Sequence, residues 1–135
     1  MYRWLIVWTL LVISAFDVSA QAPKKFIDLN KVVLTGEKIR LTHYQALDPD
    51  CTSQGKTTIR ILKEPQNGRT EVASVRAFPN YEKDNVRAKC NEQQVDASGL
   101  WYVSNVSFKG QDLIELEVIF PRGEYYKGKI KITVK

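Results

Sequence analysis

The sequence has few of the residue types on which most catalytic and metal sites depend. Its 135 residues include a single histidine, His43, and two cysteines, Cys51 and Cys90. A catalytic triad would have to use that one histidine, and no Cys-x-x-Cys, Gly-x-Ser-x-Gly, His-Glu-x-x-His or phosphate-loop motif occurs. His43 is in phase with Ile39 and Leu41, so we expect it at the margin of a core. We therefore predict no enzyme activity, no cofactor and no metal centre.

Long apolar runs are absent except at the N-terminus. Residues 4–16 are almost wholly apolar, follow a basic start and precede the small residues Ser19 and Ala20. This layout predicts a secretory signal peptide over residues 1–20 and one domain over residues 21–135. The run is short for a membrane span, which needs about 20 residues, and an uncleaved anchor is the alternative. We expect an exported protein, periplasmic or secreted, without stable membrane insertion after signal cleavage.

Runs of like charge are also absent. The sequence has 20 Lys and Arg against 15 Asp and Glu, a formal net charge of +5, yet no basic run reaches five residues. Scattered charges are typical of solvated strand faces, so we expect no nucleic-acid partner. Outside the cytoplasm, a basic protein meets anionic lipids, polysaccharides and cell wall.

Cys51 and Cys90 are predicted to form one disulfide. An even cysteine count in an exported chain favours pairing. The bond would close a loop of about 40 residues, which the chain-entropy model values at about 4 kcal/mol. A redox or metal-binding role for the two cysteines is the alternative, but the sequence has neither a Cys-x-x-Cys motif nor a second histidine to support it.

Alternation of apolar and polar residues predicts β-strands throughout the domain. It is clearest in residues 113–120 and 129–135. Further strands are expected at residues 26–34, 37–47, 57–62, 69–75, 86–90 and 100–105, with a helical turn within 81–90 as an alternative to strand 86–90. Seven or eight short strands indicate a single antiparallel β-sandwich. Trp101 is expected in its core.

Two segments are predicted to form turns. Asn67-Gly68 is a strong hairpin signal, so strand 69–75 is expected to return antiparallel to strand 57–62. Residues 108–112 form a corner, in which Gly110 adopts a positive φ. At this corner the carboxylate of Asp112 caps backbone N–H groups, and the side chain of Phe108 packs into the core.

Three motifs together resemble the cadherin-like and Ig-like repeats of bacterial surface proteins. They are the Pro-x-x-Gly of Pro65 to Gly68, the tyrosine-containing strand 100–105, and the Phe-x-Gly-x-Asp of Phe108, Gly110 and Asp112. The resemblance covers residues 59–134 and implies an Ig-like or cadherin-like β-sandwich, here as a single exported domain. It implies little about activity, because the fold hosts many roles.

The sequence also departs from that family. No aromatic residue follows soon after Asp112, and the segment of residues 78–98 is longer than the family's connection and contains Cys90. Acidic residues at domain junctions bind calcium in cadherin-like proteins. The resemblance leaves residues 48–50 and Asp112 as candidate calcium ligands. They do not supply the six to eight oxygen ligands that calcium prefers.

Glu115 and Glu117 lie on one face of strand 113–120. Paired carboxylates suggest glycoside hydrolysis. Lys129 and Lys131 on the following strand offer a simpler interpretation, in which the glutamates form cross-strand charge pairs.

The best candidate contact patch lies between the last two predicted strands. Tyr125 and Tyr126 stand there beside Arg122 and Lys127, and exposed aromatic and basic side chains on a loop are typical of binding surfaces. Alternatively, the tyrosines fold back on the sheet.

We predict a non-enzymatic binding or structural module for a protein or envelope-polysaccharide partner. The alternative is a small periplasmic inhibitor of a secreted hydrolase. Such an inhibitor would insert residues 78–81 or 121–127 into an active site.

Overall fold

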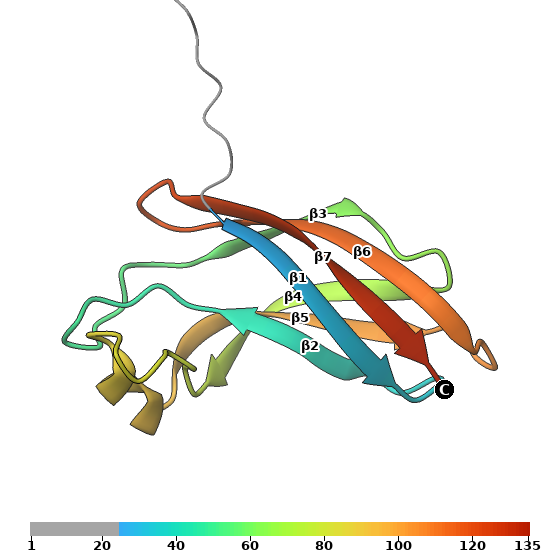
Figure 1. Cartoon of the computed structure of the whole chain (residues 1–135), viewed down its shortest axis with the longest axis horizontal. Helices are drawn as coiled ribbons and strands as arrows, with labels where there is room; N and C mark the ends of the chain where they lie inside the picture. Colours follow the sequence, from blue (N-terminus) through green and yellow to red (C-terminus); the bar gives the residue numbers. More distant parts are fainter. Residues whose placement is uncertain (1–24) are drawn as a thin grey trace, which may run out of the picture.

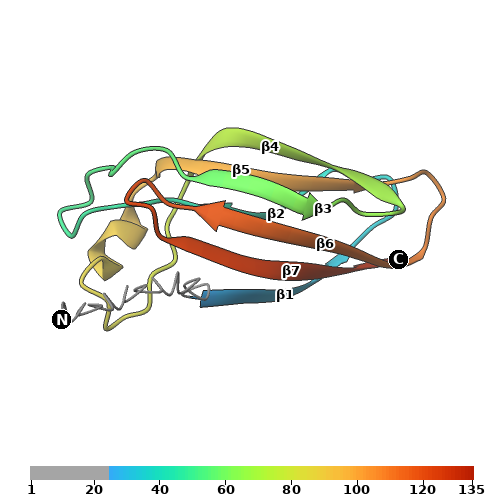
Figure 2. The same cartoon turned by 90° about the horizontal axis from the view of Figure 1, so that it is seen from above.

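The protein folds as two facing β-sheets (Figure 1, Figure 2). The computed structural model describes residues 25–135, and the predicted signal peptide lies outside them. The elements in this part of the chain are β1 (Lys25–Val33), β2 (Ile39–Tyr44), β3 (Thr58–Lys63), β4 (Gly68–Ala77), the short 3-10 helix η1 (Ala88–Glu92), β5 (Val95–Ser104), β6 (Gly110–Ile119) and β7 (Tyr125–Val134). The predicted all-β sandwich is confirmed.

The strands are ordered β1-β7-β6-β3 in one sheet and β2-β5-β4 in the other. Neighbouring strands are antiparallel, except that β1 runs parallel to β7. Gly128 of β7 lies opposite Ile27 of β1. A Cβ atom at Gly128 would collide with the carbonyl oxygen of Ile27, so the glycine lets these two strands approach closely.

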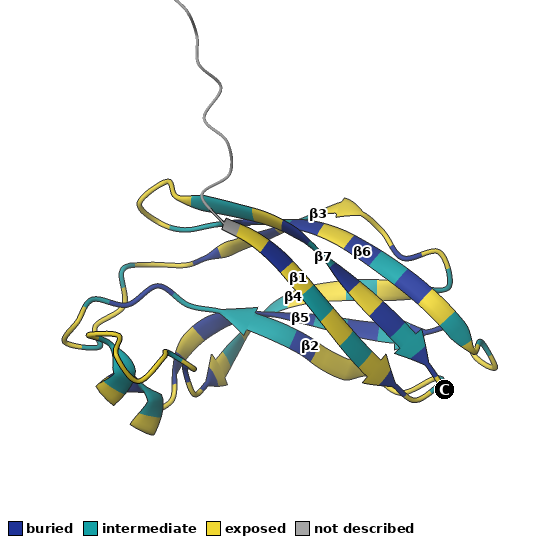
Figure 3. Cartoon of the chain, in the orientation of Figure 1, coloured by how far each residue is buried: buried dark blue, intermediate teal, exposed yellow. Residues whose placement is uncertain are grey.

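The core lies between the two inner faces, where buried residues alternate with partly or fully exposed ones along β6 and β7 (Figure 3). The main cluster consists of buried residues from both sheets: Ile27, Val33, Leu41, Ile59, Leu100, Tyr102, Ile114, Leu116, Val118, Ile130, Ile132 and Val134. Burying one such aliphatic side chain contributes about 1.5–3 kcal/mol, so this cluster is the main stabilising feature. The predicted inner faces of the last two strands are confirmed.

The predicted hairpin at Asn67-Gly68 is wrong. β3 pairs with β6 and β4 pairs with β5, so the turn between them crosses from one sheet to the other. A two-residue type I′ hairpin requires a positive φ at both central residues, and neither Asn67 nor Gly68 has one. Gly68 lies against the ring of Tyr102, where a Cβ would come within 2.5 Å of the ring.

Strand β2 contains a β-bulge that the alternation of apolar and polar residues does not reveal. Its register with β5 shifts between Arg40 and Thr42. After this bulge His43 is no longer in phase with Leu41; it lies opposite Gly99, on the outer side of the sheet. Leu41 is buried as predicted, whereas Ile39 is 39% exposed.

Two further predictions are corrected by the structure. Trp101 is only partly buried, and its ring covers Gly99 on the outer side of β5. The core aromatic is its neighbour Tyr102, which is 1% exposed, because adjacent strand residues point to opposite faces. Residues 86–90 form no strand; η1 begins at Ala88, in agreement with the helical alternative.

Candidate binding cleft

The predicted corner motif closes one end of the sandwich. Gly110 has a φ of 139°, and Phe108 packs against the main core, both as predicted. Asp112 is buried and accepts hydrogen bonds from the backbone N–H groups of Gln66 and Asn67 at 2.9 and 3.0 Å. The turn of residues 65–68 and the corner of residues 108–112 therefore meet through Asp112, and the capping role predicted for Asp112 extends to the turn between the sheets.

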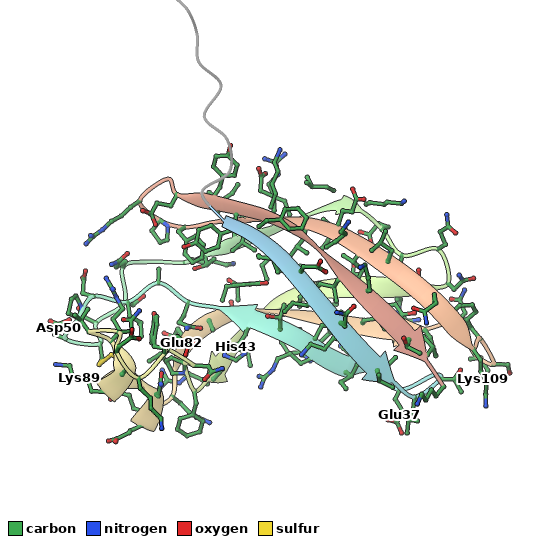
Figure 4. The ribbon with its side chains drawn as sticks, in the orientation of Figure 1. Glu37, His43, Asp50, Glu82, Lys89 and Lys109 are labelled. Carbon is green, nitrogen blue, oxygen red and sulfur yellow. A yellow bond between two sulfur atoms is a disulfide. The ribbon has the colours of Figure 1, made fainter. Side chains whose placement is uncertain are left out.

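The opposite end of the sandwich is where the long connections converge. η1 and the labelled residues Asp50 and Lys89 lie there, whereas Glu37 and Lys109 lie at the other end (Figure 4). The predicted disulfide joins Cys51 to Cys90, with a Cα–Cα distance of 5.4 Å. Loops gathered at one end of a rigid sheet framework are a common location for binding sites.

Two side-chain contacts brace these loops. Arg87 donates from Nε to the carbonyl oxygen of Leu47 at 2.6 Å. Arg122, in the turn between β6 and β7, forms an ion pair of 2.9 Å with Asp48. Together with the disulfide, these contacts connect three segments that are far apart in the sequence.

A cleft of about 750 Å³ opens between β1, the end of β2 and these loops. Its aromatic lining residues are Phe26, His43, Tyr44, Tyr81, Phe120 and Tyr126. Its amide lining residues are Gln45, Gln54, Asn80 and Asn85, and its charged ones are Asp28, Arg87, Arg122 and Glu124. Burial raises the pKa of the Tyr44 hydroxyl. The volume is within the range of about 300–1,000 Å³ that is typical of ligand sites.

The predicted patch of tyrosines and basic residues is divided between two faces. Tyr126 and Arg122 line the cleft, but Tyr125 and Lys127 do not. Tyr126 lies opposite the buried Val118, and its ring packs against Phe120 with a centroid distance of 4.8 Å. β7 begins at Tyr125, so the tyrosines are strand residues rather than the loop residues we expected.

Most of the remaining cleft residues were missed because no local motif marks them, although Asn80 and Tyr81 fall within residues 78–81, one of the two segments considered for an inhibitory loop. Tyr44 ends β2 and Gln45 follows it, while Asn80, Tyr81 and Asn85 precede η1. Only the assembled fold brings these side chains together, since more than 30 residues separate the two groups in the sequence. A cluster of amide and aromatic residues in the long segment 78–94 was the one available signal.

His43 lines the cleft but is tied to the protein framework. Its Nε2 donates a hydrogen bond of 3.0 Å to the carbonyl oxygen of Phe78, which follows β4. This bond links the end of β2 to the start of the segment that carries η1.

The two glutamates considered for catalysis lie on the outer face of the four-stranded sheet. Glu115 is opposite Lys129 and Glu117 is opposite Lys127. Glu117 also forms an ion pair of 3.2 Å with Arg60 of β3. The glutamates lie opposite basic residues of β7, but the cross-strand ion pair that forms is the one between Glu117 and Arg60, not the predicted pairs with Lys129 and Lys131.

The acidic residues considered for calcium do not come together. Asp50 accepts hydrogen bonds from the hydroxyl and N–H of Thr52, which lower the pKa of the Asp50 carboxyl. Asp48 pairs with Arg122. Asp112 lies near the start of β6, which follows Lys109 at the other end of the sandwich (Figure 4). Within residues 25–135, no three or more histidine, cysteine or acidic side chains are arranged to hold a metal ion. No helix in the same range is both long and apolar enough to cross a membrane.

No protein-family model and no curated protein matches the chain. Among solved structures, the solution structure of Amebosin is similar over 84% of this chain and 100% of its own, with a TM-score of 0.41 and 9% identity. A 2,6-sialyltransferase of the Vibrionaceae, from Photobacterium sp. JT-ISH-224, crystallised with CMP and lactose, is similar over 82% of this chain and 18% of its own, with a TM-score of 0.33 and 12% identity. At these TM-scores neither likeness supports an argument about this chain.

Proposed function

We propose that the protein is a non-enzymatic, exported binding module that holds an envelope partner in the cleft. The observation that carries this proposal is the cleft itself, a hollow of about 750 Å³ with both aromatic and polar walls. Its walls come from distant parts of the chain and are braced by a disulfide and by loop contacts. Side chains fixed before a ligand arrives lose less conformational entropy on binding.

Export is the second part of the proposal. The disulfide supports it, because such bonds persist mainly in oxidising compartments. The apolar N-terminal run supports it as a signal peptide. The module is periplasmic or secreted on this view.

Membership of the cadherin-like or Ig-like domains is a third, finer part of the proposal. The two-sheet architecture is compatible with it. The junction of the Pro65–Gly68 turn with Asp112 supports it, because Asp112 accepts hydrogen bonds from two backbone N–H groups within that turn.

The inhibitor hypothesis is less favoured by the same loops. An inhibitory loop protrudes so that it can enter an active site. Here Arg122 is paired with Asp48, and the backbone N–H of Tyr81 donates to the side chain of Asn91 at 2.9 Å. Both candidate segments are therefore held against the body of the protein.

The proposal is tested by capture from the native envelope. Tagged protein is incubated with envelope fractions as wild type, Tyr126→Ala and Tyr125→Ala, a matched pair because adjacent strand residues point to opposite faces. We expect a partner that wild type and Tyr125→Ala capture equally and that Tyr126→Ala captures about tenfold less.

A second cleft variant distinguishes a loss of binding from a folding defect in Tyr126→Ala. Asn80 is exposed, so Asn80→Ala should fold normally and also capture less partner. Equal capture by all variants would contradict the proposal. Turnover of an envelope substrate by the purified protein would overturn its non-enzymatic part, and inhibition of a captured hydrolase would support the inhibitor hypothesis instead.

A further inference from the structure

We infer that the cleft binds a neutral, hydroxyl-rich oligosaccharide segment of an envelope polysaccharide. This inference rests on the proposed function and names the ligand class for that site. Three features of the cleft support it: its aromatic rings, its amide side chains and the way its arginines are already engaged.

The aromatic rings supply apolar surfaces for sugar rings. Phe120 and Tyr126 are tilted by 57° to each other and are packed against the main core, as is Tyr44. Tyr81 packs against the smaller core cluster beside Cys90. Each ring is thus supported by the protein and also lines the cleft. The C–H groups of a sugar ring pack well against the electron-rich face of such an aromatic ring.

The amides match the hydrogen bonding of sugar hydroxyls. An Asn or Gln side chain both donates and accepts, as a hydroxyl does, and Gln45, Asn80 and Asn85 all line the cleft. The Oε1 atom of Gln45 is buried and has no hydrogen-bond partner among the described residues. A hydroxyl donor would satisfy this acceptor, because buried polar atoms are normally paired.

The charges in the cleft argue for a neutral ligand. Arg122 is paired with Asp48, and Arg87 donates to the carbonyl oxygen of Leu47. The cleft lining also includes the carboxylates of Asp28 and Glu124. The two arginines of the lining are thus matched in number by two carboxylates, so the cleft offers no net positive charge to attract an anionic ligand.

An extended peptide is a less suitable occupant. Peptides that add to a sheet are held by a row of backbone groups along one strand edge. Residues 26–29 of β1, residues 42–44 of β2 and Tyr126 of β7 line the cleft, but the rest of the lining comes from connections outside the strands. Recognition by side chains of mixed polarity favours a glycan.

The test is an NMR titration of the purified ¹⁵N-labelled protein. The probes are three neutral oligosaccharides, namely the tetrasaccharide of N-acetylglucosamine, cellotetraose and maltotetraose, with an Ala-Ser hexapeptide as control. We expect saturable shifts of the side-chain amides of Gln45, Asn80 and Asn85 with at least one glycan and none with the hexapeptide. Asn85→Ala should weaken that binding about tenfold, whereas Tyr125→Ala should not change it.

The outcomes separate this inference from the proposed function. If no glycan shifts the cleft amides, or if the shifts map elsewhere, the glycan class is wrong. If the envelope capture still yields a Tyr126-dependent partner in that case, the binding module stands with a different ligand, such as a peptide. If neither experiment gives a cleft-dependent signal, both proposals fail.

Discussion

The hydroxyl of Tyr102 donates a hydrogen bond of 2.9 Å to the carboxylate of Asp112 in the buried interface between the sheets. Tyr102 belongs to β5 and Asp112 to β6, so the bond joins one sheet to the other. The same carboxylate accepts two N–H groups from the turn that connects β3 to β4. One buried carboxylate therefore fixes both sheets and the crossing between them.

Removing this hydroxyl should destabilise the protein. Hydrogen bonds to charged groups contribute about 1.5–3 kcal/mol, so Tyr102→Phe should lower the free energy of unfolding by that amount in urea denaturation. The matched control is Tyr81→Phe, at a partly buried position outside the main core, which should change the free energy of unfolding by less than about 0.5 kcal/mol. A similar, small change in both variants would contradict the role assigned to the Tyr102–Asp112 bond.

The same bond predicts a loss of stability at alkaline pH. Burial raises the pKa of the Tyr102 hydroxyl above its ordinary value of 10.0, and the hydrogen bond and charge of Asp112 raise it further. A group whose pKa is raised by folding stabilises the fold fully below its unfolded pKa and loses that contribution as pH rises above it. Unfolding free energies measured from pH 8 to pH 12 should therefore fall more steeply in wild type than in Tyr102→Phe. Parallel slopes would count against this account.

The local parts of the fold were predictable from the sequence. The alternation in β6 and β7, the positive φ of Gly110 and the pairing of Cys51 with Cys90 depend on short-range patterns or on a simple count. The Asn67-Gly68 turn was not predictable in this way. Its conformation depends on Asp112, which is 45 residues away along the chain.

The disulfide should make the protein sensitive to reductants. It closes a loop with a sequence separation of 39, for which the chain-entropy model gives about 4 kcal/mol. A reductant should lower the unfolding free energy of wild type by about that amount. The same reductant should leave the unfolding free energy of the Cys51→Ala/Cys90→Ala variant unchanged. A wild-type protein that keeps its stability after full reduction would contradict this prediction.

Gly128→Ala should separate β1 from β7. The new Cβ would collide with the carbonyl oxygen of Ile27, and overpacking of this kind costs about 1–3 kcal/mol or more. Because β1 lines the cleft, binding of the partner should weaken as well. The control is Gly36→Ala, where a Cβ meets open space but the φ of 73° is strained. Gly36 is next to Glu37, at the end of the sandwich away from the cleft (Figure 4), so this change should cost about 1–2 kcal/mol and leave binding intact. Normal partner binding by Gly128→Ala would contradict the prediction.

The candidate site was less predictable than the fold. Tyr126 and Arg122 were identified from their composition and their place between two strands, and both line the cleft. Tyr125 was grouped with them because the turn was expected to be longer, yet the strand begins at Tyr125 and turns the two rings to opposite faces. Tyr44 and Asn80 approach this site only because two sheets and a disulfide-linked segment assemble around it.

The most direct test of the central claim is to map where an envelope partner contacts the protein. The ¹⁵N-labelled protein would be titrated with a solubilised envelope extract while its backbone amide resonances are followed. The account predicts shifts that cluster in residues 43–47, 80–87 and 120–126, around the cleft, and that disappear in Tyr126→Ala. Shifts that cluster instead on the outer faces of the sheets, or that persist unchanged in Tyr126→Ala, would contradict it.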